Sequence, residues 1–203
     1  MERLNTILSN NPDLVQMDSV RNIMIDLGKT NKYNKKTILH MLIEDEEEEQ
    51  LLTILTQYLE QKQFDEKEEA VTQGNQNRIK FANLDVNAQD INGWTPLITV
   101  IISKTNSVTK VCKLLLDLGA DPFLASRDGK NAFHWATRIG NLEVLKTLMS
   151  GYTDEQVDEM LECKTGDFYH MKPIHLAVRF DHIEVFKYLT TIGSPHGNYK
   201  DSR

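Results

Sequence analysis

The feature that most constrains this chain is a short motif that returns along it in the same internal order. Residues 131–140 read NAFHWATRIG and residues 172–181 read KPIHLAVRFD. In both, a histidine stands at the fourth place, an alanine at the sixth and an arginine at the eighth. Two further stretches, 35–44 and 93–102, keep this phase, which sets four motif starts: Thr37, Thr95, Asn131 and Lys172. A chain with such repetition is expected to fold as an array of similar units.

A second apolar stretch follows three of the motif starts. It reads TKVCKLLLDLGADP after Thr95, LEVLKTLMSG after Asn131 and IEVFKYLTTIGSP after Lys172. The spacing of the apolar residues is helical, and a glycine stands where the helix should end, because glycine tolerates a left-handed backbone. Each unit therefore predicts a turn, a short helix, a longer helix and a glycine stop.

These residues resemble ankyrin repeats, whose signature is T-P-L-H-x-A in a unit of about 33 residues. DINGWTPL at 90–97 with LLLDLGAD at 114–121 is a close match, the two later copies match well, and TILHMLIE at 37–44 is degenerate. The resemblance covers about residues 33–195. It implies an all-α fold, a solenoid of stacked helix pairs with β-hairpin-like turns, an N-terminal helical cap and inserted segments.

The spacing of the motif starts departs from the family unit. It is 58 residues from Thr37 to Thr95, 36 to Asn131 and 41 to Lys172. The first excess falls in the polar segment 61–84, which we expect to be flexible or partly helical. The last excess contains Thr153 and Gln156, a capping-box pattern that predicts a short helix over 154–162.

The expected organisation is a single domain over residues 1–203. The spacing of Leu4, Ile7 and Leu8, and of Val20, Ile23, Met24 and Leu27, predicts a helical cap at its N-terminal end. Because one helix pair cannot bury its apolar face alone, the last repeat also needs a cover, which a partner would provide. The expected parts are a cap at 1–32, a degenerate repeat at 33–60, a charged insertion at 61–84, repeats at 85–121 and 122–151, an inserted helical segment at 152–166, a repeat at 167–195 and a tail at 196–203.

Charge and composition exclude several classes of function. The net charge is −7, and residues 44–69 alone hold eleven acidic residues against two lysines, so no nucleic-acid partner is expected. The apolar run 97–102 is shorter than the ~20 residues of a membrane-spanning helix, so no membrane insertion is expected. Two cysteines make no disulfide framework and the first residues lack a signal pattern. We expect an intracellular, cytoplasmic location, with a cilium or an organelle matrix as alternatives.

The motif histidines His40, His134 and His175 invite a metal or catalytic interpretation. Metal ligands must converge on one point, whereas matched positions of stacked repeats form a row. The family resemblance implies instead that each histidine braces its turn by bonding backbone groups, and buried polar groups need such partners. We therefore predict no catalytic residue, no cofactor and no metal site.

Other candidates receive structural interpretations. His170 stands two residues before Lys172, where Gly93 and Gly129 occupy the matching places. Because a positive φ costs a non-glycine residue ~1 kcal/mol, we expect a reshaped hairpin at His170, with a partner contact as the alternative. Trp135 and Cys112 are expected in the core. No base for a nucleophilic Cys163 can be identified.

The resemblance also implies a partner-facing surface, built from the hairpin tips and the exposed face of the first helix of each unit. Aromatic residues, methionine and arginine are enriched at protein interfaces. We hypothesise a concave surface that binds a protein segment with apolar anchors and acidic residues; the alternative is that some of the aromatic side chains pack on the inserted segments. Carried over by phase, the candidate residues are Trp94, Arg127, Lys130, Arg138, Phe168, Tyr169, Met171, Arg179 and Phe180.

Three classes of function remain. The sequence favours a non-catalytic interaction module, an adaptor or scaffold that binds partner proteins. The alternative is a permanently bound subunit of a larger multiprotein assembly. An enzyme is the third class, which the sequence disfavours because no nucleophile, base and orienting group share a phase.

Overall fold

The computed structural model describes residues 15–18, 22–26, 30–67, 80–82, 84–103 and 105–193. The chain divides into two compact units, Met1–Ala120 and Asp121–Arg203, and each is described by itself. The expected single domain over 1–203 stays a prediction.

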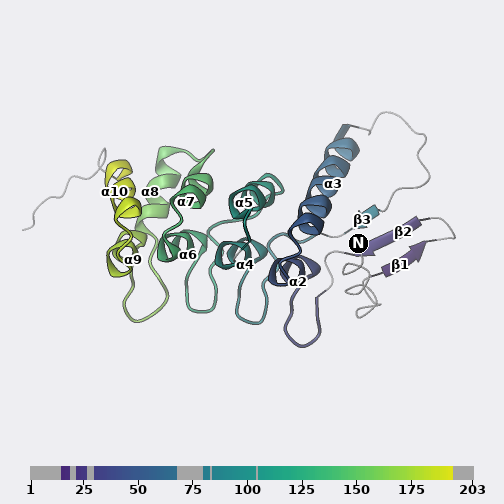
Figure 1. The fold of residues 1–203 in the computed structure, drawn as a ribbon, viewed down its shortest axis with the longest axis horizontal. Coiled ribbons are helices and arrows are strands. Elements are labelled where there is room, and N and C mark those ends of the chain that lie inside the picture. The colour runs from purple at the N-terminus through teal and green to yellow at the C-terminus, as the bar shows by residue number, and fades with distance from the viewer. Residues whose placement is uncertain are drawn as a thin grey trace, which may run out of the picture. The chain divides into compact units, whose positions relative to one another are not determined.

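The first unit contains the helices of the first two repeats. A short helix begins directly after each motif start. Thr37 and Thr95 take the extended backbone of an N-cap, and Pro96 is the first residue of the helix after Thr95. The α2 helix packs against α3 and α4, and α5 packs against α3 and α4 (Figure 1). The helices are α2 (Ile38–Glu44), α3 (Glu48–Lys67), α4 (Pro96–Ile102) and α5 (Val108–Asp117).

The second unit contains the last two repeats and the inserted helix. The α6 and α7 helices pack together, as do α9 and α10, and α9 lies beside α6 (Figure 1). The helix predicted over 154–162 is confirmed, with the capping box between Thr153 and Gln156. The helices are α6 (Ala132–Ile139), α7 (Leu142–Met149), α8 (Asp154–Glu162), α9 (Pro173–Arg179) and α10 (Ile183–Ile192).

The prediction of a helix over 20–27 is wrong, because Asn22–Asp26 is a strand, β2. It pairs antiparallel with β1 (Val15–Asp18) and parallel with β3 (Lys80–Ala82). The parallel partner lies more than fifty residues away in the sequence, so a local spacing pattern carries no sign of it. The proposed helix around Leu4 falls outside the described residues.

The segment 61–84 is partly helical, as expected, because α3 continues to Lys67. Its last part contains the strand β3, which was not predicted. Residues 68–79 of this segment and the tail 196–203 fall outside the described residues. Among the described helices, none is long and apolar enough to cross a membrane.

The turns share one left-handed backbone position in all four repeats. The residue two places before the motif start has a positive φ whether or not it is glycine: Lys35 at 58°, Gly93 at 76°, Gly129 at 70° and His170 at 45°. The hairpin at His170 is nevertheless reshaped, as expected: the Thr165 N–H bonds the Met171 carbonyl six residues on, whereas Ser126 bonds Lys130 four residues on. The neighbouring elements hold His170 in a conformation that glycine adopts at lower cost.

Candidate partner-binding surface

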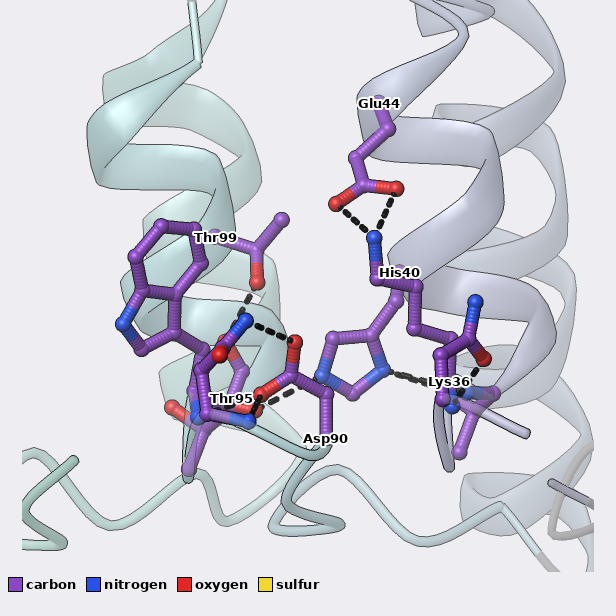
Figure 2. A network of polar contacts seen from close by, with 10 residues as sticks. Lys36, His40, Glu44, Asp90, Thr95 and Thr99 are labelled. Carbon is purple, nitrogen blue, oxygen red and sulfur yellow. Dashed lines mark hydrogen bonds and ion pairs between the residues drawn. The ribbon is translucent and has the colours of Figure 1, made fainter. Parts of the chain in front are cut away.

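His40 ties the first repeat to the hairpin of the second, within the first unit (Figure 2). Its Nδ1 accepts a hydrogen bond from the Thr37 backbone N–H at 3.2 Å, and its Nε2 lies 2.9 Å from the Trp94 carbonyl oxygen. Burial lowers the pKa of His40 despite the opposing contribution of that carbonyl. The neutral ring thus acts as the predicted brace, with Nε2 donating to the residue just before the next motif start.

His134 repeats the local part of this arrangement in the second unit. Its Nδ1 lies 3.3 Å from the Asn131 backbone nitrogen and 2.7 Å from Asn131 Oδ1. Burial lowers the pKa of His134, and the backbone groups of Cys163 and Met171 oppose this fall. The predicted brace is confirmed at both ring nitrogens of His40 and at Nδ1 of His134.

His175 makes only the local half of the brace. Its Nδ1 accepts a hydrogen bond from the Lys172 backbone N–H at 3.2 Å, but the side chain is exposed. No acceptor for its Nε2 is present among the described residues. No group of three or more histidine, cysteine or acidic side chains in the described ranges could hold a metal ion.

Cys163 lies beside His134, a juxtaposition that sequence reasoning missed. Its Sγ is 3.8 Å from His134 Nε2 and 2.9 Å from the Met160 carbonyl oxygen, and the Asn131 amide donates to it at 3.6 Å. A nucleophilic cysteine needs a lowered pKa, whereas burial raises the pKa of Cys163 to about 11. This geometry favours a structural role, fastening the end of α8 to the start of α6.

Lys130 was predicted to contact a partner, but its side chain is buried within the second unit. Its Nζ lies 2.6 Å from Asp128 Oδ2 and 3.4 Å from Asp167 Oδ2, which joins the hairpin tip to the loop before α9. Hydrogen bonds from Lys130 and Ser126, with the lysine charge, outweigh the effect of burial and lower the pKa of Asp128. Lys130 is already neutralised by its own chain, so we leave it out of the proposed surface.

Five other predicted residues lie together in the second unit, as a ladder of guanidinium groups and rings. The Arg138 guanidinium carbon is 5.0 Å from the centre of the Phe180 ring, and that of Arg179 is 6.0 Å from the same ring. The Arg179 guanidinium carbon also lies 5.4 Å from the centre of the Tyr169 ring. The Tyr169 and Phe168 rings meet edge to face, with their centres 5.9 Å apart. We call Arg138, Phe168, Tyr169, Arg179 and Phe180 the arginine–aromatic surface.

The exposure of this surface distinguishes it from a core. Phe168 is 92% exposed and Tyr169 is 67% exposed, which excludes their burial against the inserted helix α8. Neither Arg138 nor Arg179 forms an ion pair with a described carboxylate. The guanidinium groups are therefore positioned by the rings while their charges remain available.

The remaining predicted residues are placed differently. Met171 lies at the edge of the surface, where its Sδ is 3.7 Å from an Arg179 nitrogen, and Arg127 is exposed on the hairpin tip. Trp94 belongs to the first unit, so it is not placed with the others. Trp135, expected in the core, is half-buried, and its ring lies 5.2 Å from the Arg138 guanidinium. The spacing of Trp135 and Arg138, three residues apart on one helix, was the signal that could have revealed this contact.

A comparison with known families agrees with the array of helix pairs. A family model described as ankyrin repeats (3 copies) matches residues 67–158 and 109–201, which together span more than half of the chain. Ankyrin repeats generally mediate protein–protein interactions. With its four matched turns and its paired helices, this chain belongs to the ankyrin repeat family.

Proposed function

We propose that this protein is a non-catalytic adaptor that binds a partner protein through the arginine–aromatic surface. The observation that carries the proposal is the pair of guanidinium groups that share the Phe180 ring without a carboxylate from the described chain. An arginine stacked on aromatic rings loses less conformational entropy when it binds an anion, because its side chain is already ordered.

The chemistry of the surface indicates the chemistry of the partner. Both arginines lie within 6.0 Å of one ring centre, so two carboxylates on one short segment can reach them together. Phe168 and Tyr169 offer exposed apolar area beside these charges. The fitting partner is a segment that combines acidic residues with an apolar anchor.

A peptide titration tests this proposal. The probe is a fluorescent synthetic peptide of alternating glutamate and leucine, compared with the same peptide carrying glutamine for glutamate. We expect the acidic peptide to bind more tightly. The double change Arg138→Glu and Arg179→Glu should weaken its binding by about tenfold or more, since two attractive charge contacts become repulsive.

The matched control is the double change Lys110→Glu and Lys113→Glu on α5. Both lysines are exposed, and this change alters the net charge by the same amount. Equal weakening by the two double variants would show that only the overall charge matters and would refute the assigned surface. Circular dichroism of each variant establishes that the fold is retained.

A second candidate function is a permanently bound subunit of a larger assembly. One observation favours it: the apolar side chains of Val178 and Ile183, in the last repeat, are 63% and 56% exposed. Exposed aliphatic groups close together are a feature of surfaces that a partner covers. An isolated chain that stays monomeric and well dispersed at high concentration would count against this role and for the adaptor.

A further inference from the structure

We infer that the outer face of the last repeat is a second binding site, one that accepts an ankyrin-type helix pair from a partner protein. This face, which we call the end face, consists of His175 and Val178 on α9 and Phe186 on α10. It shares no residue with the arginine–aromatic surface, so the inference does not depend on the proposed function.

The first argument is the unused half of the histidine brace. In the first repeat the motif histidine reaches the residue just before the next motif start, since His40 Nε2 lies 2.9 Å from the Trp94 carbonyl oxygen. In the repeat that begins at Asn131, the buried His134 Nε2 lies 3.8 Å from Cys163 Sγ. His175 has the same local hydrogen bond at its Nδ1. Its exposed Nε2 is therefore set to donate to a hairpin carbonyl of a following repeat, and the described chain offers none.

The second argument comes from matched apolar positions within the second unit. Thr137 and Leu145 are both fully buried in the repeat that begins at Asn131. Their counterparts in the last repeat are Val178 and Phe186, which are 63% and 37% exposed. The same two positions are thus open in the last repeat, although their side chains are as apolar or more so. Their exposure costs hydrophobic free energy that a stacked helix pair would recover.

The kind of partner segment that fits the end face is indicated by the elements that cover the corresponding face of the preceding repeat. There, α9 packs beside α6, and the segment before α9 places Cys163 Sγ 3.8 Å from His134 Nε2. A helix pair of the same type offers both the apolar helix side and the hairpin carbonyl. Residues 194–203, SPHGNYKDSR, offer Tyr199 as their only large apolar side chain and are a poor chemical match.

The test extends the chain with a repeat whose sequence is known. A copy of residues 120–149, which carries a hairpin and the helices α6 and α7, is attached after Gly193, the residue that aligns with Gly119. Amide hydrogen exchange of α9 and α10 is compared between the native and the extended chain. We expect exchange to slow by about tenfold or more in the extended chain, because a covered helix pair opens less often.

Two substitutions make the result specific. His175→Ala should leave exchange in the native chain nearly unchanged but remove a large part of the slowing in the extended chain. Glu184→Gln, at a position exposed in both repeats, is the control and should have the same small effect in both chains. Unchanged exchange of α9 and α10 on extension would overturn the inference.

Sedimentation of the native chain distinguishes the source of the occupant. A monomer at all concentrations agrees with a partner's helix pair. A dimer that Phe186→Glu dissociates would mean that a second copy of the chain covers the end face, which would overturn the assignment to a different protein. The peptide titration with the Arg138 and Arg179 variants tests the arginine–aromatic surface separately, since neither residue lies on the end face.

Discussion

The repeat that begins at Asn131 and the repeat that begins at Lys172 share a motif but not an environment. His134 is 1% exposed and has partners on both ring nitrogens, whereas His175 is exposed and has one described partner. Thr137 is buried where Val178 is exposed, although valine is the more apolar residue. Burial at a motif position is therefore decided by the following neighbour in the array, and the residue type alone does not determine it.

The largest difference is expected for the matched pair Leu145 and Phe186. Leu145→Ala should lower the free energy of unfolding by about 3 kcal/mol, since it leaves a cavity in a closed core. Phe186→Ala should cost about 1 kcal/mol, because its ring is partly in water already. Urea unfolding followed by circular dichroism measures both values. Equal costs would mean that the end face is already covered in solution.

The motif histidines should differ in the same direction by a smaller amount. His134→Ala should cost about 2 kcal/mol, because it leaves the buried backbone N–H and side-chain oxygen of Asn131 without their partner. His175→Ala should cost about 0.5 kcal/mol, the loss of one exposed capping bond. The same unfolding experiment applies. A His175 variant as damaging as the His134 variant would contradict the description of the last repeat as open.

A pH dependence should follow from the two buried histidines. Burial lowers the pKa of His40 and of His134 below 6.5, so the unfolded chain binds more protons than the folded one as the pH falls below that value. The stability that these two neutral histidines contribute is fully present above pH 6.5 and is lost as the pH falls toward their pKa values in the folded chain. Each histidine contributes at most about 1.4 kcal/mol per pH unit.

Urea unfolding at pH 7.5 and at pH 5.5 measures this loss. We expect His134→Gln to be less stable than the wild type at pH 7.5 but to lose less further stability at pH 5.5. The carboxyls of Asp128 and Asp167 have lowered pKa values, so their contribution is lost only below about pH 4 and does not enter this interval. A variant with the wild-type pH dependence would assign the effect to other groups.

The repeats could be predicted from the sequence because their signals are local. The phase of the motif predicted the short helix after each motif start, and the capping box at Thr153 predicted α8. The strand pairing of Asn22–Asp26 with Lys80–Ala82 was missed because both segments are short and their contact is distant in sequence. Ile23 and Met24 fit a helical spacing as well as a buried strand, and only the partner strand decides between them.

The candidate surface could be predicted only in outline. The phase of the repeats alone located Arg138, Arg179 and Phe180. In the structure, both guanidinium groups lie within 6.0 Å of the centre of the Phe180 ring. Phase also selected Lys130, whose buried ammonium pairs with Asp128 of its own hairpin and with Asp167 of the next loop. Distance along the sequence likewise concealed the contact of Cys163 with His134. A repeat pattern thus predicts the backbone position of a side chain, but the residues of adjacent repeats decide whether that side chain faces a partner.

The smallest expected effect concerns His170, which shares a backbone conformation with Gly129 but not its freedom. At an ordinary helical or extended position, alanine is more stabilising than glycine by about 0.5–1 kcal/mol. At His170, with φ at 45°, this order should reverse, so that His170→Gly is more stable than His170→Ala by about 1 kcal/mol. The stability of the wild type should fall between theirs. His170 Nδ1 lies 3.3 Å from the Thr165 carbonyl oxygen, and this contact offsets part of the backbone strain. Thermal unfolding of the three proteins gives the ranking. An alanine variant more stable than the glycine variant would show that position 170 leaves the left-handed region in solution, and the four hairpins would then not share their positive φ.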